Sequence, residues 1–308
     1  MKKRAIISLL VSLVVVSFTI PALAAPLSET EEVPEPVYEE AEQEAEPEAF
    51  IYLDGIPQFV EYELRDGTTF ITVSSFVTMV DPQAVVEEEN GVAVISSARV
   101  EQIVDAEGNT ANVVQETLSM TVSAQTPYIV ANGRCLYAKD SIVMLNGHVA
   151  APVRILAKVF NLNASYDAAA QAAVLTHDPA CGAYIQSGDS YYDSDTLYWL
   201  SHIINAESGN QSLDGKIAVG NVVMNRVNSP EFPGTIYDVL YQRNQFTPAI
   251  TGSIKRTPND GSVVAAKLVM EGTQIVPTAL FFNMAGLNCY ASRNRTYVAT
   301  IGDHAFYD

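Results

Sequence analysis

Apolar and polar positions along the chain follow four different patterns. Residues 1–24 run from basic residues through a mostly apolar stretch to small residues, and residues 25–50 are polar and rich in glutamate. Residues 51–178 alternate with the two-residue period of strands, whereas from residue 197 onward apolar residues recur at helical spacing. The pattern therefore predicts an α+β protein with two folded parts, 51–178 and 194–308, behind two segments that belong to neither core.

The first of these parts contains a pattern that occurs twice. A shift of 80 residues places residues 65–96 on residues 145–176, so that Asp66 falls on Asn146 and each is followed by glycine. Both copies predict a two-residue turn, a strand, a short helix, an alternating strand, another turn and a final strand. Residues 51–178 are therefore expected to form a β-rich α+β repeat domain.

Residues 179–193 are small and polar without a period, which predicts a linker, and a helix is expected to follow them. Ser194 or Asp195 is expected to cap this helix, and Gly209 is expected to end it. Leu200, Ile203, Ile204 and Glu207 are spaced as i, i+3, i+4 and i+7, which places them on one face of this helix. The acid Glu207 therefore shares a face with three apolar residues.

The rest of the second domain alternates helical and strand-like stretches. Small and β-branched residues over 215–227 predict a helix packed closely against a neighbour, and 235–242 predicts a short one. Another helix is expected between "PNDGS" and Gly272, then a strand at "ALFFN" and an ending at "VATIGDHAFY". Helices followed by short strands indicate an α+β domain.

The start of the chain carries two further expectations. Residues 1–24 have the order of a secretory signal peptide, while a membrane anchor is the alternative, although the apolar core is short for a bilayer span. Residues 25–50 contain ten glutamates and no lysine or arginine, which predicts a disordered acidic linker. We therefore expect a secreted protein without a stable membrane anchor.

Charge outside that linker excludes one class of partner. The formal net charge is −19, but from residue 197 to the end eight acids balance eight bases. Nucleic-acid binding requires a basic surface that neutralises phosphates. We therefore expect no nucleic-acid partner.

Glu207 is the strongest candidate for chemistry on residue pattern alone. A carboxyl group on a buried helix face, at the carboxyl end of the helix dipole, is pushed toward its protonated form. That form is the one that a general acid needs. The alternative is an ion pair between Glu207 and Arg226 that ties two helices together.

Other chemistries find less support. The three cysteines, Cys135, Cys181 and Cys289, fit neither a dense disulfide framework nor a metal site, and one disulfide or three free thiols are both open. A peptidase using Cys181 or Cys289 with His304 lacks the glycine-framed nucleophile turn. Neither His-Glu-x-x-His nor Gly-x-Ser-x-Gly occurs. We expect no metal and no cofactor.

Four separated segments, "INAESG", "GKIAVGNVVMNRVNSPEFPGTIYDVLYQRNQFTP", "ALFFN" and "IGDHAFY", resemble the SleB-type cell wall hydrolase family, which includes spore cortex-lytic enzymes. The resemblance implies a lysozyme-like α+β fold over 194–308 that cleaves the glycan strands of peptidoglycan, with Glu207 as catalytic acid. It also implies that the sugar cleft is lined by Asn225, Gln245, Phe246, Thr247, Asn283 and His304. Each of these also has a structural interpretation, such as a helix-end cap for Asn225 or a core position for Phe246.

One candidate acid favours one mechanism. Glycoside hydrolysis usually needs two carboxylates, whereas a single glutamate suffices for lytic transglycosylation, in which the sugar's own C6 hydroxyl closes a 1,6-anhydro ring. Asp214 or Asp260 as a second acid would instead make a muramidase. Many relatives carry a further glutamate where this chain has Asn210, which keeps open a non-catalytic wall-binding or coat-binding protein with an inactive hydrolase domain.

The segment "YIVANGRCLYAKDSIVMLNGHVAAPVRILAKVFN" resembles the copper amine oxidase N-terminal-like repeat domain of exported proteins. Copper is not expected, because His148 and His177 are the only histidines of this half and form no ligand cluster. The resemblance implies a structural or wall-binding module over 51–178, with wall or spore-coat proteins as its partners. The whole protein is expected at the cell wall or the spore.

Overall fold

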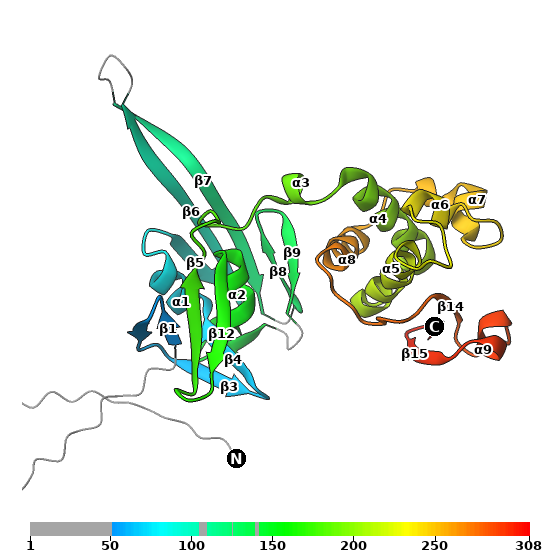
Figure 1. The fold of residues 1–308 in the computed structure, drawn as a ribbon, viewed down its shortest axis with the longest axis horizontal. Helices are drawn as coiled ribbons and strands as arrows, with labels where there is room; N and C mark the ends of the chain where they lie inside the picture. Colours follow the sequence, from blue (N-terminus) through cyan, green and yellow to red (C-terminus); the bar gives the residue numbers. More distant parts are fainter. Residues whose placement is uncertain (1–50, 105–109, 125, 139–141) are drawn as a thin grey trace, which may run out of the picture. The chain divides into compact units, whose positions relative to one another are not determined.

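The computed structural model describes residues 51–104, 110–124, 126–138 and 142–308 (Figure 1). The expected signal peptide and acidic linker lie outside these residues. Within the described ranges, no helix has both the length and the hydropathy that crossing a bilayer requires. Cys135, Cys181 and Cys289 are all free thiols, which decides between the two cysteine states that the sequence left open.

Two segments of the first half have the same order of elements. One consists of β4 (Thr68–Thr72), α1 (Val73–Val80), β5 (Val85–Glu89) and β6 (Val92–Val104). The other consists of β11 (His148–Pro152), α2 (Val153–Val159), β12 (Leu162–Asp167) and β13 (Ala172–His177). The turns before them have positive φ at both residues, as in Asp66-Gly67 (47° and 78°) and Asn146-Gly147 (50° and 89°), which two-residue hairpins favour. Each segment thus has the element order that its sequence predicts.

Three sheets contain the strands of this half. Their orders are β12-β13-β1-β2, β10-β11-β4-β3 and β5-β6-β7-β8-β9. In the last sheet β6 and β7 form the long hairpin of Figure 1. The remaining strands are β1 (Ile51–Leu53), β2 (Ile56–Gln58), β3 (Tyr62–Arg65), β7 (Thr110–Ser123), β8 (Tyr128–Ala131), β9 (Arg134–Tyr137) and β10 (Val143–Leu145).

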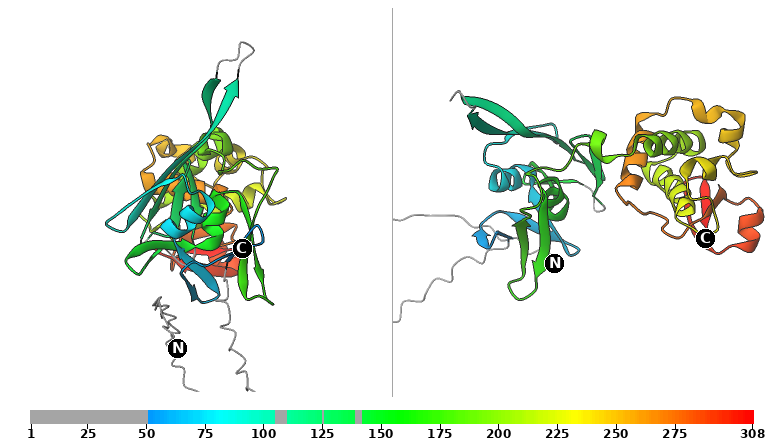
Figure 2. Two further views of the ribbon diagram at one scale, coloured as in Figure 1. Left: turned by 90° about the vertical axis from the view of Figure 1, so that its left-hand side faces the viewer. Right: turned by 45° about the horizontal axis from the view of Figure 1, so that its top comes forward.

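Helices α4 (Ser194–Ser208), α5 (Leu213–Val227) and α8 (Asp260–Met270) pack on one another in the second half, as both Figure 1 and the right-hand view of Figure 2 show. A Cβ atom added to Gly220 of α5 would lie 2.9 Å from side-chain atoms of both Ile204 and Val269. The small residues predicted to allow close packing therefore do so.

A three-stranded sheet, β14-β16-β15, completes this half. Its strands are β14 (Phe281–Met284), β15 (Tyr297–Ile301) and β16 (His304–Tyr307). The short helices are α3 (Gly188–Tyr191), α6 (Ile236–Leu240), α7 (Thr247–Thr251), the 3-10 helix η1 (Ser253–Lys255) and α9 (Tyr290–Asn294). The described residues of both halves mix helices and strands, as the sequence predicts.

Two local details differ from expectation. The N-cap of α4 is Asp193, whose side chain accepts a hydrogen bond from the Thr196 N–H at 2.8 Å, so the prediction of Ser194 or Asp195 was wrong by a residue or two. The segment expected as a linker, 179–193, contains buried Tyr184 and Ile185, which join the core of the first half. Because most residues of 179–193 are small and polar, the sequence pattern does not reveal that Tyr184 and Ile185 are core residues.

Candidate active site

Glu207 lies in the last turn of α4, next to the buried face formed by Leu200, Ile203 and Ile204. Burial raises the pKa of its carboxyl group from 4.5 to about 6, and no charged side chain contributes to the shift. Within the described residues, its carboxyl group makes neither a hydrogen bond nor an ion pair. Glu207 is therefore a half-buried acid that retains its proton at mildly acidic pH.

Arg226 is not the partner of Glu207. Its Nε donates to the Leu280 carbonyl at 2.7 Å, and its guanidinium lies 4.9 Å from the ring centre of Phe232, 5.1 Å from Phe246 and 5.3 Å from Phe281. Burial lowers the pKa of this side chain to about 10. Arg226 thus holds α5 against the segment that enters β14, so the alternative of a helix-tying pair with Glu207 is wrong.

The chain just after Glu207 is fixed to the start of α8. Gly209 approaches the preceding turn so closely that an added Cβ would lie 2.5 Å from the Asn205 carbonyl oxygen. The Asn259 amide donates from Nδ2 to the Gly209 carbonyl at 2.9 Å, and its backbone N–H donates to Asn205 Oδ1 at 3.1 Å. Since Asn259 is also the N-cap of α8, one residue sets both the helix start and the position of the Glu207 loop.

A second connection joins this loop to the β15–β16 turn. Gln211 donates from Nε2 to Asp303 Oδ2 at 2.8 Å, and its Oε1 accepts from the Asp303 N–H at 3.1 Å. Lys216, a largely buried cation whose pKa is lowered by burial, donates to the Gln211 carbonyl. The start of β16, with His304, is thereby held close to the loop that follows Glu207.

Two of the predicted cleft residues, His304 and Phe246, lie beside the Phe282 ring. The His304 ring meets the Phe282 ring edge-on, with centroids 5.3 Å apart. The Phe246 ring, at the N-cap of α7, has its centroid 6.3 Å from that of Phe282. Asn283 follows Phe282 on β14 and pairs with Ala305. Burial lowers the pKa of His304, so its imidazole is neutral at pH 7, and its Nδ1 is buried without a partner among the described residues.

The other three predicted cleft residues differ in their surroundings. Asn225 donates from Nδ2 to the carbonyls of Val276 and Ala279, at 3.1 and 2.9 Å, so its amide nitrogen holds backbone in place. Gln245 and Thr247 are exposed on either side of buried Phe246. Their roles toward a sugar remain predictions.

Asn221 lies one turn before Asn225 and is not among the residues that the sequence predicts for the site. It is fully buried and makes three hydrogen bonds to the segment before β14: Nδ2 to the Thr273 carbonyl at 2.8 Å, and Oδ1 from the N–H groups of Ile275 and Val276 at 2.8 and 3.3 Å. The only sequence signal is an amide within a run of small and β-branched residues. Asn221 therefore shapes the route into β14.

The described residues show no arrangement that supports a second catalytic acid, a cysteine peptidase or a metal site. Asp214 and Asp260 lie exposed in the first turns of α5 and α8, and neither affects the pKa of Glu207. Cys289 caps α9 and Cys181 is exposed, and no contact joins either of these thiols to His304 within the described part of the chain. Among the same residues, no group of three or more His, Cys, Asp or Glu side chains is arranged to hold a metal ion.

The comparisons with known proteins concern this half of the chain. Residues 210–307 match the Cell Wall Hydrolase family. The matched region begins just after Glu207 and includes all six predicted cleft residues. It accounts for about a third of the chain, so the remainder lies outside the family match.

Individual relatives are similar over nearly the same extent. The spore cortex-lytic enzymes of Bacillus cereus and Bacillus subtilis strain 168 are 28% and 26% identical over 116 residues, which is 37% of this chain. Those residues cover 45% and 38% of the two relatives, so the chain matches less than half the length of each. The catalytic domain of the germination-specific lytic transglycosylase SleB from Bacillus anthracis is 26% identical, with a TM-score of 0.36, over 40% of this chain and 100% of that domain.

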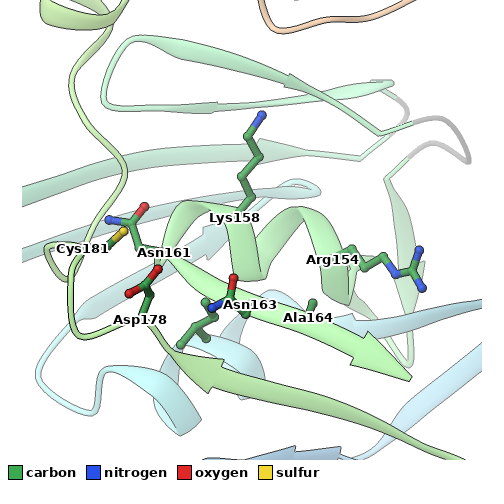
Figure 3. A pocket seen from close by; sticks show the side chains of 8 residues that line it. Arg154, Lys158, Asn161, Asn163, Ala164, Asp178 and Cys181 are labelled. Atoms are coloured by element: carbon green, nitrogen blue, oxygen red, sulfur yellow. The ribbon is translucent and has the colours of Figure 1, made fainter. Parts of the chain in front are cut away.

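A cavity in the other half holds none of the predicted site residues. It has a volume of about 390 Å³ and lies beside α2 and β12 (Figure 3). Its polar lining consists of Arg154, Lys158, Asn161, Asn163, Asp178 and Cys181. This cavity therefore belongs to the part of the chain outside the Cell Wall Hydrolase match.

Burial of Glu207 predicts a stability change with a defined pH window. Because its pKa in the folded protein, about 6, exceeds the ordinary 4.5, the folded state retains the proton between these values. Wild-type stability therefore falls as pH rises through that window, by up to about 2 kcal/mol at about 1.4 kcal/mol per pKa unit. Glu207→Gln is expected to be more stable than wild type at pH 7 by that amount and similar below pH 4.5. Urea unfolding followed by Trp199 fluorescence measures both, and a difference that does not change with pH would contradict a raised pKa.

Proposed function

We propose that the chain is a secreted enzyme of the cell wall or spore that cleaves peptidoglycan glycan strands between N-acetylmuramic acid and N-acetylglucosamine by lytic transglycosylation. The observation that carries the proposal is the half-buried Glu207 carboxyl, whose pKa is raised to about 6 by burial alone. The Cell Wall Hydrolase match of residues 210–307 and the similarity to spore cortex-lytic enzymes support the substrate class.

The mechanism requires one acid that acts twice. Glu207 first donates its proton to the glycosidic oxygen, and the bond between that oxygen and C1 of muramic acid breaks. The resulting carboxylate then accepts the proton of the C6 hydroxyl while O6 bonds to C1, which closes the 1,6-anhydro ring and regenerates the acid. Holding the strand so that C6 faces C1 replaces an attacking water by a group of the substrate itself.

The surroundings of Glu207 favour this route over hydrolysis by a retaining pair of carboxylates. A retaining glycosidase places its two carboxyl groups about 5–5.5 Å apart, and an inverting one about 6.5–9.5 Å apart. A second carboxylate at the shorter distance would raise the pKa of Glu207 through charge repulsion, but the shift has no such contribution. Gln245, Thr247, Asn283 and the neutral His304 are proposed to hold the acetamido and hydroxyl groups of the sugars, beside buried Phe246 and Asn225.

Activity is expected to follow the protonation of Glu207. Since the protonated form starts the reaction, kcat/KM on soluble glycan fragments should decrease as pH rises through about 6, where the carboxyl group ionises. Rates measured between pH 4.5 and pH 8 test this. A kcat/KM that stays constant up to pH 8 would contradict Glu207 as the proton donor.

The function as a whole is tested on two substrates. The full chain is incubated with isolated spore cortex and with vegetative walls, while turbidity and soluble sugar are followed. We expect solubilisation of at least one of them. Tight binding without any release of sugar would favour the alternative, a non-catalytic wall-binding or coat-binding protein, for which Asn210 is the motivating residue.

We further propose that residues 51–178 attach the enzyme to wall or coat components.

A further inference from the structure

Five aromatic side chains form a continuous group on α4, on α6 and at the C-cap of α6, called here the Trp199 cluster: Tyr198, Trp199, His202, Tyr237 and Tyr241. The Trp199 ring meets Tyr237 and Tyr241 edge-on, with centroids 5.4 and 5.9 Å apart, and these two tyrosines stack at 4.5 Å. Tyr198 lies 5.0 Å from Trp199 and 4.0 Å from the His202 ring. Each ring of the cluster therefore contacts at least one other.

The cluster is open to solvent and its polar groups are available. Tyr198 is 45% and Tyr237 is 49% exposed. The phenol hydroxyls of Tyr198, Tyr237 and Tyr241 make no hydrogen bond within the described part of the chain. Half-exposed tyrosines that present a ring face and a free hydroxyl are typical of binding surfaces, because one end is apolar and the other polar.

The cluster lies outside the immediate surroundings of Glu207. Trp199 precedes Glu207 by eight positions, which corresponds to about 12 Å along α4 and about 80° around its axis. Tyr198 lies half a turn around the helix from Glu207. A ligand that reached both places would have to extend beyond a single sugar ring.

We propose that the Trp199 cluster is a second binding surface for a glycan strand, which holds polymeric substrate outside the Glu207 site. This inference rests on the proposed function. A sugar ring presents a face of C–H groups bordered by hydroxyls, and the half-exposed rings with free phenol hydroxyls match both features. Because two attachments on one polymer raise the effective concentration of the strand at the second, the surface should favour long strands and be indifferent to short ones.

The test uses the full chain with Glu207→Gln, so that bound strands are not cleaved, and measures binding to peptide-free glycan strands and to short fragments. Adding Tyr237→Ala is expected to weaken binding of long strands about tenfold and to leave short fragments within about twofold. The matched control is Tyr290→Ala on α9, which removes a 60% exposed tyrosine from the same half of the chain and should change neither. Far-UV circular dichroism verifies folding, because Trp199 itself contacts Tyr237 and its fluorescence would change without any unfolding.

Three results would overturn the inference. Unchanged binding of long strands by Tyr237→Ala would exclude the surface, and an equal loss for long and short strands would assign Tyr237 to the Glu207 site. A change from dimer to monomer in analytical ultracentrifugation, with glycan binding intact, would assign the rings to self-association. If the chain with Glu207 intact cleaves nothing while Tyr237 still governs binding, the surface stands and the proposed catalysis falls.

Discussion

Replacing Glu207 by Gln is expected to lower the rate of glycan cleavage by about 10²- to 10⁴-fold, the range over which a positioned general acid contributes. The amide preserves the shape of the side chain but has no proton of suitable acidity to give to the leaving oxygen. The variant should remain folded, since the buried carboxyl group has no ion pair or hydrogen bond to lose within the described residues. Initial rates of sugar release from isolated walls measure the loss.

Two matched substitutions make that result specific. Asp214→Asn and Asp260→Asn remove the other acids considered for catalysis, both of them exposed in first turns of helices. Each is expected to retain activity within about threefold, since neither acid affects the Glu207 carboxyl group. A loss from either that matches the loss from Glu207→Gln would indicate a two-carboxylate muramidase instead.

Asn221→Ala is expected to lower the free energy of unfolding by about 3–5 kcal/mol, a larger change than we expect from Glu207→Gln or Asn288→Ala. The substitution leaves the Thr273 carbonyl and two N–H groups, of Ile275 and Val276, without partners in a buried site. Each unsatisfied buried group costs about 1–3 kcal/mol, and neighbouring losses do not add fully. Urea unfolding monitored by Trp199, the chain's single tryptophan, reports on this half of the chain.

The matched control for this change is Asn288→Ala, which removes an exposed asparagine from the same half. It is expected to change the free energy of unfolding by less than about 0.5 kcal/mol. Asn221→Asp offers a second comparison, because it keeps an acceptor for the two N–H groups but loses the donor to Thr273. If Asn221→Ala proved as stable as Asn288→Ala, the segment before β14 would not depend on this amide.

The position of Glu207 could be predicted because it depends on local information. Helical periodicity places it on the face of Leu200 and Ile203, and that face is buried in the structure. The cap could not be resolved to one residue, since Asp193, Ser194 and Asp195 are all competent N-caps. Which of them has extended backbone is decided by the path of the chain before the helix rather than by side-chain type.

The supports of the site could not be predicted, because they join residues far apart in sequence. Asn259 reaches back to Gly209, and Gln211 meets Asp303, through single polar side chains that belong to no periodic pattern. Asn221 lies in an apolar run, and nothing in its own neighbourhood shows that the partners are backbone groups of another segment. Long-range polar contacts of this kind become visible only in three dimensions.

The most direct test of the Glu207 mechanism is mass spectrometry of the muropeptides released in water enriched in oxygen-18. Lytic transglycosylation predicts products that end in 1,6-anhydro-muramic acid and contain no heavy oxygen, because O6 of the same sugar attacks C1. Release of reducing muramic acid ends that carry one heavy oxygen would show that water is the nucleophile and would contradict the account.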